Sequence, residues 1–181
     1  MFLKISSALG KEIDAKIVNG VLLKYNFNAI TEDELYLLFE NNFITINDKE
    51  IFLKHDLILE GIYDSIEKDE KKLIHERIGF EIEYIYSDKI EHYYFALADH
   101  FTKAAHKEKM IEYLEKAGDR AKAEWDLEKA RGYYEKYLKE KEKKSLDCNF
   151  LVKHCSVLYT LGDWSELKIF INWIKSTDKC D

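Results

Sequence analysis

The chain has 181 residues, of which 46% are hydrophobic and 35% charged, and its formal net charge is −7. This composition is sufficient for one ordinary domain or two small ones, and it argues against global disorder. The negative charge argues against general binding to nucleic acid or anionic membranes, and no apolar run approaches the roughly 18 residues of a membrane span. Because the sequence contains no proline and only seven glycines, we expect a mainly α fold.

Residues 1–66 are predicted to form a small winged-helix-like unit with one β-hairpin. The stretches ISSALG and DAKIVNGVLLKY have helical spacing, and Thr31 with Glu34 forms a capping box at the start of a third helix. The runs FITI and IFLK are typical of strands, and they flank NDKE, which favours a tight turn. The apolar residues on one face of the third predicted helix are Leu35, Leu38 and Phe39.

Residues 67–181 are predicted to form helix pairs, beginning after the charged run EKDEKK. These pairs resemble degenerate tetratricopeptide repeats, whose period is about 34 residues, and they predict a short α-α superhelix. The predicted helix caps in this region are Asp88 with Glu91, Asp126, and Asp163 with Glu166. The predicted packing positions are Tyr94, Leu97, Ala98, Phe101, Leu114 and Ala117, and later Leu151, Cys155, Leu158, Leu167, Ile171 and Ile174. The middle helices fit the repeat poorly, so an ordinary helical bundle remains an alternative.

The three cysteines, Cys148, Cys155 and Cys180, match neither a disulfide framework nor a metal-binding pair. The first residues show no long apolar segment of the kind found in signal peptides. We therefore predict reduced thiols and a cytoplasmic location.

Several short motifs follow one another in an order that resembles a known family. They are SALGKEID, ELYLLFENNFI, FLKHDLILEGIYDSI, LIHERIGFEIE, ALADHF and EKMIEYLEKAGDRA. This order resembles the region that follows the nucleotide-binding module in STAND-class signalling ATPases, as in soluble class III adenylyl cyclases. The resemblance spans roughly residues 5–140. It implies that the winged-helix unit packs against a nucleotide-binding module and that the repeats act as a sensor or scaffold.

His55 and Asp56 are polar residues within an apolar stretch, and two interpretations remain open. In the structural interpretation Asp56 caps the following helix and His55 packs at the end of a strand. The family resemblance instead implies that His55 senses the phosphate of a nucleotide held by a partner domain, a role that imidazole suits because it titrates near neutral pH.

Catalytic motifs are not evident in the sequence. The string Gly10-Lys11-Glu12 lacks the spacing and hydroxyl of a phosphate-binding loop, and no paired metal-binding aspartates are visible. We therefore predict a non-enzymatic protein with no cofactor and no metal. The alternative is a fragment of a larger ATPase or adenylyl cyclase whose catalytic domains lie outside this chain.

The predicted partners are proteins, including a nucleotide-binding ATPase domain. The candidate contact residues are Tyr94, Tyr133 and Tyr137, since tyrosine is common at interfaces. DNA binding by the third helix is disfavoured, because residues 25–48 contain no lysine or arginine and several acidic residues. Membrane binding is not expected.

Overall fold

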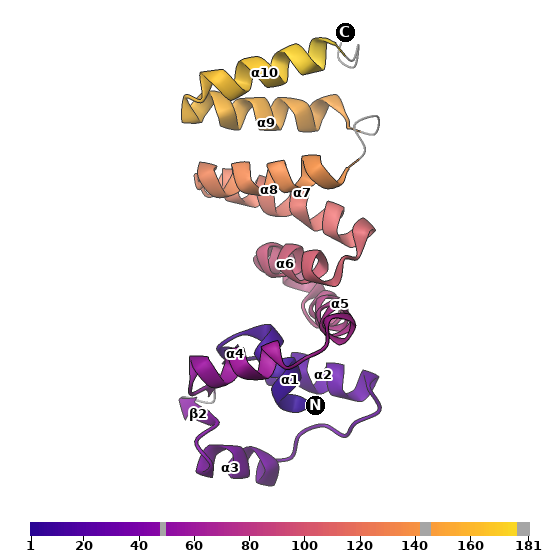
Figure 1. The fold of residues 1–181 in the computed structure, drawn as a ribbon, viewed down its shortest axis with the longest axis vertical. Helices are drawn as coiled ribbons and strands as arrows, with labels where there is room; N and C mark the ends of the chain where they lie inside the picture. Colours follow the sequence, from indigo (N-terminus) through magenta and orange to yellow (C-terminus); the bar gives the residue numbers. More distant parts are fainter. Residues whose placement is uncertain (48–49, 142–145, 177–181) are drawn as a thin grey trace. The chain divides into compact units, whose positions relative to one another are not determined.

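The computed structural model describes residues 1–47, 50–141 and 146–176, and it is mainly helical with one small antiparallel sheet (Figure 1). This confirms the predicted fold class. The chain divides into two compact units, Met1–His106 and Lys107–Asp181. Among the described residues, none of the helices combines the length and the hydrophobicity that crossing a membrane requires.

The first unit begins in the order helix, strand, helix, helix, strand, strand, which is the order of a winged helix. These elements are α1 (Phe2–Leu9), β1 (Glu12–Ile13), α2 (Ala15–Lys24), α3 (Glu32–Glu40), β2 (Ile44–Asn47) and β3 (Glu50–Leu53). The sheet order is β1-β3-β2 with all pairs antiparallel. The predicted hairpin is thus present, whereas the two-residue strand β1 was not predicted.

The rest of the first unit is helical. It consists of α4 (Asp56–Asp64), α5 (Lys68–Ile85), the 3-10 helix η1 (Ser87–Tyr93) and α6 (Tyr94–Ala104). Helix α5 packs against α1, α2 and α6, and its buried residues Ile74, Ile78 and Ile82 extend the core formed by the elements before it. The first compact unit therefore continues to His106, beyond the boundary after residue 66 that the sequence suggested.

Polar contacts also tie α5 to α1 and α2. Lys4 of α1 forms an ion pair with Glu70 of α5 at 2.8 Å. Glu81 of α5 is almost fully buried and pairs with Lys24 of α2 at 2.5 Å. Such contacts, added to the shared apolar core, make α5 a structural part of the first unit.

Two helix starts differ from the sequence predictions. Helix α4 begins at Asp56 itself, so the cap residue is His55, and its side chain makes no capping hydrogen bond. At the predicted Asp88 box the chain forms η1, with Tyr86 as its cap residue and no side-chain cap. Within η1, Lys89 has non-helical dihedral angles, which interrupts the α-helical geometry that a capping box requires.

The second unit is helical over its described residues. Its elements are α7 (Lys107–Ala123), α8 (Leu127–Glu140), α9 (Cys148–Leu161) and α10 (Trp164–Lys175), each packed against the next (Figure 1). Asp126 and Asp163 cap α8 and α10 as predicted, by accepting hydrogen bonds from backbone N–H groups three residues ahead. The core side chains include Leu114, Ala117, Tyr134, Tyr137, Phe150, Leu151 and Leu158.

The cysteine prediction is partly wrong. Cys155 is a free, half-buried thiol, and its burial raises its pKa. Cys148, in contrast, is disulfide-bonded, so the expected reduced thiol is not found at this residue. Cys180 lies outside the described residues.

Candidate protein-binding surface

Helix α3 is well defined at its start but poorly covered along its length. The Thr31 backbone N–H donates to Glu34 at 2.9 Å, and the Glu34 backbone N–H donates to the Thr31 hydroxyl at 3.2 Å, which completes the predicted capping box. Yet none of the nine residues of α3 is buried. The predicted inner face is only half covered, since Leu35 and Leu38 are half-buried and Phe39 is 43% exposed.

One side of α3 forms a groove with the neighbouring strand β2. Its lining residues are Glu32, Leu35, Tyr36, Phe39 and Ile46, and its volume is about 410 Å³. We call this feature the α3–β2 groove. The four α3 residues are spaced i, i+3, i+4 and i+7, so they share one helix face. Tyr36 is 64% exposed and Ile46 is 45% exposed, which leaves large apolar side chains in contact with water.

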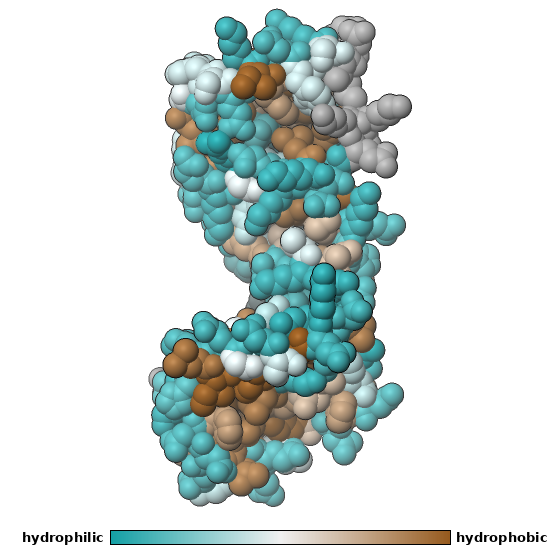
Figure 2. Space-filling model, viewed as in Figure 1, coloured by the Kyte–Doolittle hydropathy of each residue, from teal (hydrophilic) through white to brown (hydrophobic). Residues whose placement is uncertain are grey.

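The other side of α3 borders a second apolar hollow of about 390 Å³. Leu37 and Leu38 form one wall, and the start of α1 with Phe27 and Ile30 forms much of the rest. On the face drawn in Figure 2, hydrophobic side chains gather over the region between α4 and α3. Monomeric proteins rarely expose large contiguous apolar patches unless these patches bind something.

Carboxylates lie at both ends of α3. Glu32 and Asp33 stand in the first turn, where the helix dipole favours negative charge. Glu40 is the last residue of the helix, where the same dipole disfavours it. Within the described part of the chain, neither Glu32 nor Glu40 has an ion-pair partner. The charge of Glu40 therefore has no local structural explanation.

Glu32, Asp33 and Glu40 entered the sequence predictions only as evidence against DNA binding, and Tyr36 and Ile46 carried no prediction. The sequence did contain an indication of this surface, because aromatic residues occur there in a stretch that has no lysine or arginine. Helical periodicity could not show that the apolar face of α3 lacks a covering neighbour.

His55 lies on the surface between β3 and α4. Its side chain is exposed, and the neighbouring Asp56 forms an exposed ion pair with Lys11 at 3.3 Å. The structural interpretation, with Asp56 as cap and His55 packed at the strand end, is therefore wrong. The nucleotide-sensing interpretation stays a prediction.

Replacing His55 by alanine should change the free energy of unfolding by less than about 0.5 kcal/mol, because the imidazole is exposed and makes no capping bond. Because the phosphate-sensing role needs a nucleotide held by a partner domain, ADP at millimolar concentration should leave the melting temperature of both proteins unchanged. Thermal melts with and without ADP measure both effects. A loss of several degrees on substitution, or an ADP-dependent shift in the isolated chain, would contradict this expectation.

The predicted contact tyrosines differ in exposure. Tyr94 and Tyr133 are half-buried. Tyr137 is fully buried, and its ring centroid lies 4.1 Å from that of Phe150. The prediction of Tyr137 as a partner contact is therefore wrong, because the ring belongs to the core of the second unit.

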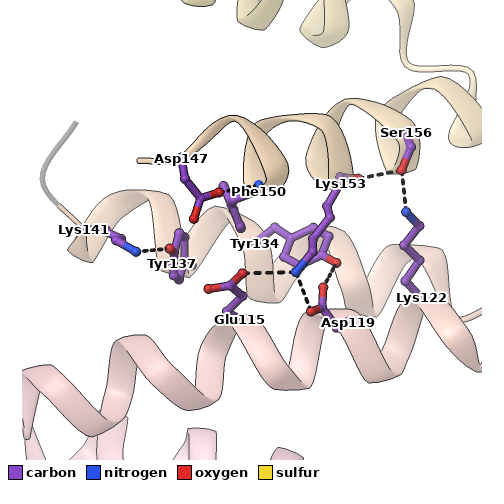
Figure 3. A network of polar contacts seen from close by, with 10 residues as sticks. All are labelled: Glu115, Asp119, Lys122, Tyr134, Tyr137, Lys141, Asp147, Phe150, Lys153 and Ser156. Carbon is purple, nitrogen blue, oxygen red and sulfur yellow. Dashed lines mark hydrogen bonds and ion pairs between the residues drawn. The ribbon is translucent and has the colours of Figure 1, made fainter. Parts of the chain in front are cut away.

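A polar network lies beside this core (Figure 3). Lys153 of α9 pairs with Asp119 at 2.7 Å and with Glu115 at 3.1 Å, both on α7. The hydroxyl of Tyr134 on α8 donates to Asp119 at 2.6 Å. Burial alone would lower the pKa of Lys153, but its bonds to Asp119 and Glu115 outweigh burial and raise the pKa. The network joins three helices, and its groups satisfy one another, so we assign it a structural role.

A buried histidine pair lies in the first unit. The Nδ1 atoms of His75 on α5 and His100 on α6 are 2.9 Å apart, so one donates and the other accepts. His75 Nε2 lies 2.8 Å from the hydroxyl of Tyr63. Burial lowers the pKa of His75 to about 3 and of His100 to about 4. Both rings are thus neutral at pH 7, which is compatible with the Nδ1–Nδ1 contact, since one of the two nitrogens must lack a proton to accept.

The described residues contain no group of three or more metal-binding side chains close enough to hold an ion.

No protein-family model, curated protein or solved structure matches this chain.

Proposed function

We propose that the chain is a non-catalytic protein-interaction and regulatory module that binds a protein partner through the α3–β2 groove. The observation that carries this proposal is that α3 exposes large apolar side chains along a groove without burying any residue. Exposure of an apolar helix face to water is unfavourable. Binding of a partner would remove this face from water when the protein functions.

The resemblance to the region after the nucleotide-binding module of signalling ATPases supports a regulatory setting. In this proposal the winged-helix unit meets a nucleotide-binding partner domain in the cytoplasm, and the helix pairs, taken as tetratricopeptide-like, provide further contacts. The order of elements around the three-stranded sheet supports the winged-helix part. His55 remains the candidate nucleotide-sensing residue.

The alternative is a fragment of a larger ATPase or adenylyl cyclase whose catalytic domains lie outside this chain. A phosphate-binding loop and cyclase motifs in the coding sequence upstream of Met1 would favour it.

Quantitative affinity capture tests the proposal. Tagged wild-type protein and the Tyr36→Ser variant are expressed in the native cell, and the captured proteins are quantified by mass spectrometry. Tyr84→Ser is the matched control, because Tyr84 is 79% exposed in the same compact unit. We expect at least one protein captured by wild type and by the control to be depleted about tenfold with Tyr36→Ser. Equal capture by all three proteins would contradict the proposal.

A further inference from the structure

The chemistry of the partner can be inferred from what lines and flanks the α3–β2 groove. The lining is mainly apolar, with Leu35, Phe39 and Ile46, together with the exposed ring of Tyr36. Carboxylates stand at the two ends of α3: Glu32 lines the groove at the start of the helix, and Glu40, which is not a lining residue, is the last residue of the helix. None of the described residues that line the groove carries a positive charge.

These features exclude several classes of partner. Phosphates of nucleic acid and of anionic lipid would be repelled by the carboxylates at the two ends of α3. A second copy that used the same face would bring Glu32 and Glu40 against like charges, in a protein that already carries a net charge of −7. A partner with an apolar stripe and flanking cations would not be repelled by these carboxylates. Its cations would also compensate the negative charge of Glu40, which the helix dipole disfavours.

We propose that the α3–β2 groove binds an amphipathic helix of a partner protein, with an apolar stripe and a lysine or arginine at each end of that stripe. This inference rests on the proposed function and specifies the partner of the same surface. Helix-in-groove binding uses apolar anchors at i, i+3, i+4 and i+7, which match a groove formed along one helix face.

The spacing of the cations follows from helix geometry. Glu32 and Glu40 are about 12 Å apart along the axis of α3, at a rise of 1.5 Å per residue. A partner helix that runs alongside α3 would place cations at i and i+7 or i+8, about 10–12 Å apart, with its apolar anchors between them.

The test uses two labelled 15-residue helical peptides of alanine and leucine, identical except for lysine or glutamate at the two flanking positions. Fluorescence anisotropy measures their dissociation constants for the full chain. We expect the lysine peptide to bind at least tenfold more tightly than the glutamate peptide, with a difference that shrinks in high salt. Tyr36→Ser should weaken the lysine peptide about tenfold.

Charge reversal provides the decisive control. The Glu32→Lys/Glu40→Lys variant should prefer the glutamate peptide. The control variant, Glu128→Lys/Glu140→Lys, reverses two exposed carboxylates of the second unit and should keep the wild-type preference for the lysine peptide. Circular dichroism and melting temperatures confirm that each variant is folded.

The outcomes separate this inference from the proposed function. If both peptides bind equally and Tyr36→Ser weakens both, the cationic partner is overturned while the groove remains a binding surface. If neither peptide binds although Tyr36-dependent capture from cells persists, the amphipathic cationic helix is also overturned. Concentration-dependent self-association of the wild type that Tyr36→Ser abolishes would identify a second copy as the occupant and overturn the inference.

Discussion

At pH 5 the free energy of unfolding should be several kcal/mol lower than at pH 7.5, because three histidines are buried as neutral rings. They are His75 and His100 in the first unit and His154 in the second, and each is at most 5% exposed. Burial lowers the pKa of His154 to about 4, as it lowers those of the other two. A neutral buried ring becomes a cation only on unfolding in this pH range.

The sign follows from proton uptake. In the unfolded chain each histidine has its ordinary pKa of 6.5, so it binds a proton as the pH falls below that value. In the folded chain it stays neutral down to about pH 4. The unfolded state therefore binds more protons, and stability is lost as the pH falls from 6.5. At pH 5, about 1.5 pH units below the ordinary pKa, the loss is roughly 2 kcal/mol per histidine.

Urea denaturation between pH 7.5 and 5 measures this loss, in a window above the ordinary pKa values of aspartate and glutamate. The charges around the first pair include Lys71, Asp99 and Lys103, and those around His154 include Arg131 and Glu135.

His154→Leu is the matched variant. The Nδ1 atom of His154 has no hydrogen-bond partner among the described residues, and Phe170 packs against the ring at 4.8 Å between centroids. Leucine has a similar volume and no polar atom, so stability at pH 7.5 should change by less than about 1.5 kcal/mol. About 2 kcal/mol of the acid-dependent loss should disappear from the measured free energy of unfolding. An unchanged pH dependence in this variant would show that His154 is not buried neutral.

The second large effect concerns two glycines in helices of the second unit. Adding a Cβ atom at Gly118 on α7 would place it 2.3 Å from Cε1 of Tyr134, a ring that is fully buried. Adding one at Gly132 on α8 would meet no atom within 4 Å. Gly118→Ala should therefore destabilise the protein by about 1–3 kcal/mol through overpacking. Gly132→Ala should stabilise it by up to about 1 kcal/mol through helix propensity.

A double-mutant cycle isolates the cause. Tyr134→Ala alone should cost about 3–5 kcal/mol, because it leaves a cavity beside Phe150 and removes the hydrogen bond to Asp119. In that background Gly118→Ala should no longer destabilise, since the ring that it meets is gone. Chemical denaturation of the four proteins gives the coupling free energy. Additive effects, or destabilisation by Gly132→Ala equal to that by Gly118→Ala, would contradict the packing described for this core.

Local features of the fold were predictable from the sequence, because their causes span only a few residues. Thr31 and Asp163 were recognised as helix caps from the spacing of three residues to Glu34 and Glu166, and Asp126 from its place before a helical run. The structure confirms all three caps. Asp88 has the same spacing to Glu91, but the chain there forms a 3-10 helix and the box is absent. The spacing alone is therefore not sufficient for a cap.

Features that depend on distant residues could not be predicted. Strand β1 exists only because Glu12 and Ile13 pair with β3, far along the chain. The His75–His100 contact joins two helices and leaves no periodic signal in the sequence. Tyr133 and Tyr137 are equivalent in a sequence pattern, but only Tyr137 lies wholly in the core.

The candidate site illustrates the same limit in another form. The amphipathic pattern of α3 identified an apolar face with Leu35, Leu38 and Phe39, and such a pattern predicts that the face will be covered. It does not say whether the cover comes from the same chain. The exposure of Tyr36 and Phe39 shows that, within the described residues, it does not.

The most direct test of a partner on the α3–β2 groove is site-specific photo-crosslinking in the native cell. Benzoylphenylalanine replaces Tyr36, which is 64% exposed, or Tyr84, which is 79% exposed and lies on α5. Both positions carry an exposed aromatic ring, so the substitution should disturb folding little at either. The account predicts a discrete crosslinked adduct of higher mass at Tyr36 and none of comparable yield at Tyr84. Equal labelling at the two positions, or no adduct at Tyr36, would contradict it.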